Sequence, residues 1–126
     1  MDKTIFVADD EEDFVSTVRS RLEFEGYKVS TAADGKEALE RILKEKPDLI
    51  LLDILMPTMN GYQVCRELKG NAGTRSIPIV MLTAKSQASD RFWGKEAGAD
   101  VYLVKPFDMD DLMKEVVAQI GGLLDE

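Results

Sequence analysis

The chain has 126 residues, of which 44% are hydrophobic and 32% are charged, and this size and balance predict a single globular domain over residues 1–126 with a core of its own. The formal net charge of −8 argues against nucleic-acid binding by this domain. The absence of histidine excludes histidine catalysis, histidine metal ligands and self-phosphorylation on histidine, and a lone cysteine excludes an internal disulfide.

The sequence carries no sign of export or of membrane insertion. A strand pattern begins at Thr4, which leaves no room for a signal peptide, and no apolar run approaches the length of a membrane span. Cys65 lies in a helical pattern, which favours a small buried filler over a nucleophile, and a single cysteine fits a reducing compartment. We therefore expect a cytoplasmic protein.

The first third of the chain alternates strand and helix patterns. A β-rich run over residues 4–8 stops at an acidic run over residues 9–13. Apolar residues four apart then predict a helix that Gly26 ends. A second strand is expected over residues 27–33, and a second helical face follows it until Pro47 stops the helix.

The central strand is the most distinctive part of the sequence. Residues 49–52 are all apolar without alternation, which predicts a strand buried on both faces in a parallel sheet. The run ends at Asp53, and Pro57 and Gly61 prevent regular structure from continuing. A carboxylate therefore stands at the carboxyl end of a buried strand, where open α/β sheets bind ligands, although an isolated aspartate there is also typical of a turn or a helix cap.

The second half continues the alternation. We expect a helix over residues 62–68, a strand over 77–82, a helix over 86–97, a strand over 101–104 and a last helix between Asp108, which is suited to cap it, and Gly121. Five strands alternating with five helices predict an α/β protein with a parallel sheet. No internal repeat or low-complexity tract interrupts this order.

Polar residues follow four of the five predicted strands. They are Asp9 and Asp10 after the first, Asp53 after the third, Thr83 after the fourth and Lys105 after the fifth. Because the carboxyl ends of parallel strands share one edge of the sheet, we expect these side chains to meet. Each one taken singly is also compatible with a helix cap or a surface charge, but their recurrence at matching strand ends favours a site.

Three neighbouring carboxylates call for a cation. Two like charges ~4 Å apart repel by about 4 kcal/mol at an effective dielectric of 20, and one lysine offsets only part of that repulsion. An all-oxygen site suits Mg²⁺ or Mn²⁺. A metal beside a carboxylate, a lysine and a hydroxyl would support phosphoryl transfer to Asp53.

These motifs resemble the receiver domain of two-component response regulators over essentially the whole chain. The motifs are Asp9-Asp10, the segment 52–57 with Gly61, Thr83-Ala84, the segment 98–100 and Lys105-Pro106-Phe107. The resemblance implies a flavodoxin-like three-layer sandwich whose parallel sheet has the strand order 2-1-3-4-5, an order for which a chemotaxis receiver is a standard example. It also implies a cis Lys105-Pro106 bond.

The resemblance further implies the roles of the site residues. Asp53 would accept the phosphoryl group in a chain that catalyses its own phosphorylation and slow dephosphorylation. Mg²⁺ would be held by Asp10, Asp53 and the Leu55 carbonyl, with Asp9 acting mainly through water. Lys105, the Thr83 hydroxyl and the Ala84 amide would bind phosphoryl oxygens. Thr83 and Tyr102 would form the switch, and Leu55 and Lys85 would slow hydrolysis.

The implied partners are proteins. The phosphoryl donor would be a sensor histidine kinase or a histidine phosphotransfer protein. The output would pass to a downstream protein or a second copy through the helix over residues 86–97, the strand over 101–104 and the last helix. Within that first helix, at least one of Phe92 and Trp93 is also expected to fill the core.

Two other functions are weighed against this interpretation. A haloacid-dehalogenase type phosphatase also uses a strand-end aspartate, but it needs a second aspartate where this chain has Leu55. A flavodoxin needs a small polar phosphate-binding loop after the first strand, where this chain places the acidic residues 9–13. Both alternatives are disfavoured by residues in the sequence.

Overall fold

The computed structural model describes residues 2–83 and 97–121. The strands are β1 (Thr4–Ala8), β2 (Lys28–Ala32), β3 (Leu49–Asp53), β4 (Ile79–Thr83) and β5 (Val101–Val104). The helices are α1 (Glu12–Phe24), α2 (Gly35–Glu45), α3 (Gly61–Lys69) and α5 (Met109–Ile120). Among these residues, no helix is both long and apolar enough to cross a membrane.

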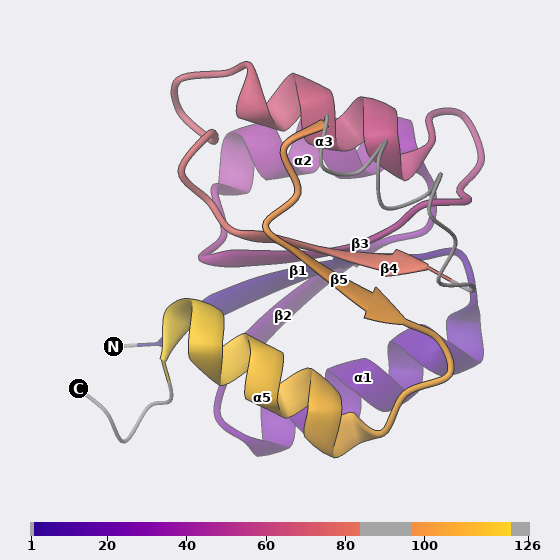
Figure 1. Ribbon diagram of the computed structural model, residues 1–126, viewed down its shortest axis with the longest axis vertical. Helices are drawn as coiled ribbons and strands as arrows, with labels where there is room; N and C mark the ends of the chain where they lie inside the picture. The colour runs from indigo at the N-terminus through magenta and orange to yellow at the C-terminus, as the bar shows by residue number, and fades with distance from the viewer. Residues whose placement is uncertain (1, 84–96, 122–126) are drawn as a thin grey trace.

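The strands form one parallel sheet in the order β2-β1-β3-β4-β5. Helices α2 and α3 cover one face of the sheet, and α1 and α5 cover the other (Figure 1). This arrangement confirms the predicted flavodoxin-like three-layer sandwich. The described residues contain four of the five predicted helices, and the fifth, expected over residues 86–97, falls almost entirely outside them.

The core consists of two apolar layers, one on each side of the sheet. Strand β3 is buried along its whole length, as the unbroken apolar run before Asp53 predicts, and β4 is buried in the same way. In β3, alternate side chains enter opposite layers, so that Ile50 and Leu52 pack under α2 and α3 while Leu49 and Leu51 pack under α1 and α5. The centre of the sheet is therefore a rigid base for residues at its edge.

Several local predictions are met and others shift by one or two residues. Gly26 follows the end of α1 with φ at 102°, as the C′ role requires. Strand β2 starts after Tyr27, because the Tyr27 amide still donates to Leu22 in the last turn of α1. Strand β4 starts at Ile79, after Pro78, rather than at residue 77. Asp108 occupies the N-cap position of α5, but its side chain makes no capping hydrogen bond.

Cys65 is buried in the core, as predicted from its place in a helical pattern. The thiol lies 3.4 Å from the carbonyl oxygen of Ala97 and contacts the layer under α2 and α3. Burial raises the pKa of the thiol to about 11, so Cys65 is a neutral side chain at physiological pH.

Candidate functional site

The carboxyl ends of the strands bring three aspartates together. Asp9 follows β1 directly, Asp10 comes next in the chain, and Asp53 is the last residue of β3. One carboxylate oxygen from each lies within 4.8 Å of the others. Asp9 and Asp53 are buried and Asp10 is exposed, so the cluster is open to solvent on one side. All strands point toward this edge of the sheet (Figure 1).

Lys105 is the cation of this cluster. Its ammonium donates to Asp9 Oδ2 at 2.6 Å and lies 3.9 Å from Asp53 Oδ1. It also donates to Glu11 Oε1 at 3.0 Å. The Lys105 side chain is only 14% exposed, and burial disfavours its charge. The hydrogen bonds to Asp9 and Glu11 and the charges of Asp53 and Asp9 together outweigh burial and raise the pKa of Lys105.

Burial and like charge raise the pKa of Asp53 to about 7, since the Asp53 side chain is only 11% exposed and its carboxylate lies near those of Asp9 and Asp10. Lys105 and the backbone amide of Ile54 act in the opposite direction without cancelling the effect. The cluster therefore holds more negative charge than Lys105 neutralises. A hard divalent cation with oxygen ligands fits such a donor set.

The loop after β3 is held closely against the site. Ile54 donates its amide hydrogen to the Leu82 carbonyl at 3.2 Å, and Gly61 donates to the Ile54 carbonyl at 2.8 Å. Gly61 has no room for a side chain, because a Cβ there would lie 2.3 Å from the Asp53 carbonyl oxygen. These contacts fix the start and end of a loop in which Leu55 is 74% exposed.

The same loop is tied to the start of α2. The Thr58 hydroxyl donates to Asp34 Oδ1 at 3.0 Å and accepts from the Lys36 amide at 3.0 Å. Asp34 also caps α2 by accepting from the Glu37 amide, and the hydrogen bonds from that amide and from Thr58 lower the pKa of Asp34. The backbone carbonyl of Leu55 is thus carried by a loop anchored to two elements.

The remaining predicted site residues that the structure describes lie in or beside strands β4 and β5. Thr83 is buried at the end of β4, and its carbonyl accepts from the Lys105 amide at 2.6 Å. Tyr102 pairs with Met81 across β4 and β5 and packs against the layer under α2 and α3. The Lys105-Pro106 bond is cis, as expected. Ala84, Lys85, Phe92 and Trp93 fall outside the described residues.

Two contacts of Lys105 are absent from the sequence prediction. Glu11 pairs with Lys105, and the ring of Phe14 lies under its ammonium, 4.1 Å from the ring centroid. Glu11 stands within the acidic run, which signals charge but not which carboxylate reaches the lysine. Phe14 fits the apolar stripe of α1, so its spacing signals only a core position.

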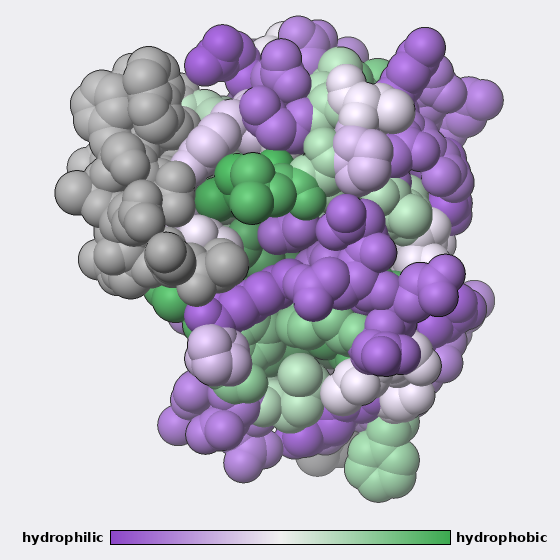
Figure 2. Space-filling view, turned by 90° about the vertical axis from the view of Figure 1, so that its right-hand side faces the viewer, coloured by the Kyte–Doolittle hydropathy of each residue, from purple (hydrophilic) through white to green (hydrophobic). Residues whose placement is uncertain are grey.

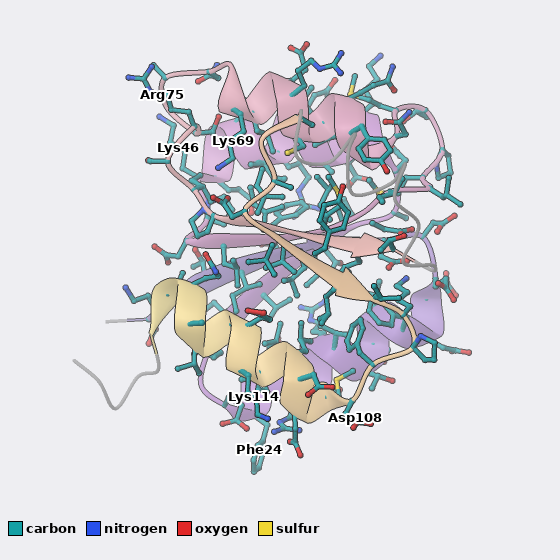
Figure 3. The ribbon with its side chains drawn as sticks, viewed as in Figure 1. Phe24, Lys46, Lys69, Arg75, Asp108 and Lys114 are labelled. Atoms are coloured by element: carbon teal, nitrogen blue, oxygen red, sulfur yellow. The ribbon has the colours of Figure 1, made fainter. Side chains whose placement is uncertain are left out.

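Some basic residues lie away from the site, and one of them, Lys69, has partners of its own. Lys46, Lys69 and Arg75 lie on the side of the molecule opposite the strand carboxyl ends (Figure 3). The Lys69 ammonium donates to the carbonyls of Arg75 and Ile77 and to the Asp100 carboxylate. In the part of the chain that the structure describes, the ion pairs that reach Asp9 and Asp53 come from Lys105.

The face seen in Figure 2 carries a band of hydrophilic surface with hydrophobic patches above and below it. One nearby hollow of about 420 Å³ is lined by Lys105 and Glu11 and by the apolar side chains of Phe14, Pro106, Phe107 and Met109. The charged site is therefore bordered by apolar surface that comes from α1 and from the segment after β5.

Comparisons with known proteins agree with this geometry. The family model "Response regulator receiver domain" matches residues 5–117. The alkaline phosphatase synthesis transcriptional regulatory protein PhoP of Bacillus subtilis (strain 168) is 44% identical over 98% of this chain and 49% of its own length. The chain spans about half the length of the curated relatives it matches.

Two solved structures are similar over nearly their full lengths. The chemotaxis protein CheY4 of Vibrio cholerae has a TM-score of 0.89 and 33% identity, covering 94% of this chain and 99% of that chain. The receiver domain of the sensor histidine kinase PA1611 of Pseudomonas aeruginosa PAO1 has a TM-score of 0.89 and 30% identity, covering 97% of this chain and 100% of that chain. The second of these structures holds a magnesium ion coordinated in its active-site cleft.

Proposed function

The chain belongs to the receiver domains of two-component response regulators, and from this we propose that Asp53 is the residue that takes up the phosphoryl group. The observation that carries the assignment is the buried strand-end carboxylate of Asp53, within 4.8 Å of Asp9 and Asp10 and beside Lys105. Asp53 ends a strand that is buried along its whole length, which holds it rigidly, and the exposed Asp10 beside it leaves the cluster open to solvent, which allows a donor to approach.

In the proposed reaction, a carboxylate oxygen of Asp53 forms a bond to phosphorus while the P–N bond to the donor imidazole breaks. The electron pair of that bond stays on the imidazole nitrogen. Lys105 offsets charge on the phosphoryl oxygens, and we assign the Thr83 hydroxyl and the Ala84 amide as further donors to them. Asp53 must be ionised to react, and the nearby ammonium of Lys105 favours that state.

Receiver domains bind Mg²⁺ in an acidic pocket, and the donor set here fits that ion. We propose that the carboxylates of Asp10 and Asp53 and the carbonyl of Leu55 hold it, with the carboxylate of Asp9 acting mainly through water. When bound, Mg²⁺ or Mn²⁺ would neutralise charge on the incoming phosphoryl group. The chain's own contribution is to keep three oxygen donors together at the end of a rigid sheet.

Histidine kinases are the partners of receiver domains, and we propose one, or a histidine phosphotransfer protein, as the donor to this chain. PhoP, which it resembles, is named a transcriptional regulatory protein, but the chain covers only half of that protein, so a role in transcription is a proposal too. We propose that the signal leaves through β5, α5 and the segment 86–97, with Thr83 and Tyr102 as the switch. A cytoplasmic location stays a prediction.

No described residue at this site favours the phosphatase alternative. Such an enzyme needs an acid two residues after the nucleophile, and that position holds the exposed side chain of Leu55. The family model that matches the chain describes a response-regulator receiver. We therefore propose a phosphoryl acceptor rather than a hydrolase that turns over an external substrate.

The proposal is tested by incubating the chain with acetyl phosphate and measuring its intact mass. With Mg²⁺ present we expect a gain of one phosphoryl group, and with excess chelator we expect none, because three carboxylates repel an anion. Acetate with inorganic phosphate serves as the control and should add nothing. Equal uptake with and without the divalent cation would contradict the proposed site.

The lifetime of the phosphorylated chain gives a second prediction. Water must approach the acyl phosphate in line with the scissile bond, and an apolar side chain at Leu55 gives that water no hydrogen bond. Leu55→Asn is therefore expected to speed phosphate release, and Lys85→Glu should act in the same direction by removing a paired charge.

Phosphate release from the purified phosphoprotein measures this effect. Leu55→Met is the matched control, since it keeps an apolar side chain of similar size, and it should release phosphate at the unmodified rate. If Leu55→Asn and Lys85→Glu, alone and together, leave the rate unchanged, neither side chain shields the phosphoryl group.

A further inference from the structure

The ammonium of Lys105 contacts an aromatic ring, that of Phe14, which has no role in the reaction proposed above. Lys105 Nζ lies 4.1 Å from the centroid of the Phe14 ring, well inside the range of a cation–π interaction. Phe14 belongs to the first turns of α1, whereas Lys105 follows β5, so the contact joins two elements that are far apart in the sequence.

The Phe14 ring is itself held in place. Its partner is Phe107, whose ring centroid lies 5.8 Å away with the two planes at 84°, an edge-to-face arrangement. Both rings are half-buried and line the hollow of about 420 Å³ beside the site. An aromatic pair of this kind fixes the orientation of the face that Phe14 presents to the ammonium.

Among the described residues, the ammonium of Lys105 also forms ion pairs with three carboxylates, which lie in different directions from it. Asp9 is 2.6 Å away and buried, Glu11 is 3.0 Å away with a side chain 65% exposed, and Asp53 is 3.9 Å away. An exposed ion pair such as that with Glu11 restrains a lysine weakly. The Phe14 ring is uncharged and half-buried. Its attraction for the Lys105 ammonium therefore persists when a cation or another partner binds these carboxylates.

We propose that Phe14 is a positioning residue. Its ring face holds the Lys105 ammonium beside Asp53, where the phosphoryl group would bind. The inference rests on the proposed function, in which Lys105 pairs with the phosphoryl group. Simple apolar packing is the alternative, because Phe14 also belongs to the layer under α1 and α5. The two explanations differ in one respect: packing needs only apolar volume, whereas positioning needs an aromatic face.

The experiment compares Phe14→Leu, which keeps apolar volume, with Phe14→Tyr, which keeps the ring. The rate of phosphorylation by acetyl phosphate at fixed Mg²⁺ is measured for both, together with their affinity for beryllofluoride. We expect Phe14→Leu to lower the rate and the affinity roughly fivefold, and Phe14→Tyr to stay within about twofold of the unmodified chain. Glu11→Gln, which removes the exposed ion pair, is expected to change either quantity by less than about twofold.

A second set of variants separates this inference from the function on which it rests. In a Lys105→Met background, Phe14→Leu should have no further effect, because the ring then has no ammonium to hold. If Phe14→Leu and Phe14→Tyr are equally slow, or if Phe14→Leu still slows the Lys105→Met chain, Phe14 only packs. If Lys105→Met alone phosphorylates at the full rate, it is the proposed role of Lys105 that fails.

Folding of each variant is checked by circular dichroism. A second test uses the unmodified chain and measures the proton chemical shifts of Lys105 by NMR. Protons held over a ring face resonate upfield, so the ε-methylene protons of Lys105 should lie upfield of those of Lys114, an exposed lysine on α5. An unshifted Lys105 resonance would overturn the inference even if Phe14→Leu did not fold.

Discussion

Asp53→Asn is expected to abolish phosphoryl uptake from acetyl phosphate, whereas Asp48→Asn should leave it intact. The amide of asparagine cannot attack phosphorus as a carboxylate does, and no other carboxylate of the cluster ends the central strand. Asp48 is the matched control, because it precedes β3 and its carboxylate accepts from the Thr4 amide at the opposite end of the strand.

Intact mass spectrometry of the three proteins in Mg²⁺ measures this difference. A phosphoryl group on the Asp53→Asn chain, at the level of the unmodified chain, would show that another residue accepts it. Loss of uptake in Asp48→Asn would show instead that carboxylate removal disturbs the sheet in general. Circular dichroism of each variant separates that second result from a true effect on the site.

The fold was predictable because its signals are local and repeated. The unbroken apolar run before Asp53 indicates burial on both faces, and β3 has it. The alternation of strands with helices indicates a parallel sheet, and the convergence of strand ends follows from that topology alone. The strand order itself came from the resemblance, because nothing in the spacing of the elements distinguishes one order from another.

The site was predictable in its members but not in its contacts. That Asp9, Asp10 and Asp53 would meet follows from the parallel sheet. That Lys105 would lie nearer to Asp9 than to Asp53 does not follow, because its position depends on side-chain packing around Phe14. The sequence pattern treats Phe14 as one more core residue and gives no sign of its second contact.

The helix cap predicted at Asp108 is met in position but not in hydrogen bonding. The residue type of Asp108 and its place before a helical pattern predict a cap, and Asp108 does stand at the N-cap position of α5. The side chain nevertheless makes no capping hydrogen bond, since the choice between the backbone and solvent depends on a side-chain rotamer that the sequence does not encode. Residue type thus predicted the position but not the interaction.

The final prediction concerns stability, and it follows from the crowding of charge around Asp53. Asp53→Asn is expected to stabilise the chain at pH 8 without divalent cations by about 2–4 kcal/mol, since one pKa unit corresponds to about 1.4 kcal/mol. The pKa of Asp53 is raised from an ordinary value of 3.8 to about 7, chiefly by burial and then by Asp9. The charged form therefore opposes folding.

The sign of the pH dependence follows from proton binding. Between about pH 4 and pH 7 the folded chain binds more protons at Asp53 than the unfolded chain does, so the contribution of this group to stability is fully present below pH 4 and is lost as the pH rises through about 7. Asparagine resembles the protonated carboxyl and does not titrate. The advantage of Asp53→Asn should therefore be small at pH 4 and largest at pH 8.

Urea unfolding of both proteins between pH 4 and pH 8, with and without Mg²⁺, checks this prediction. Added Mg²⁺ should stabilise the unmodified chain more than Asp53→Asn, because the substitution removes one of the carboxylates that we propose to hold the ion. A constant difference in the free energy of unfolding across this pH range would contradict the raised pKa. If Mg²⁺ stabilised both chains equally, Asp53 would not be among the ligands, because replacing a carboxylate ligand with a neutral amide weakens the binding of a divalent cation.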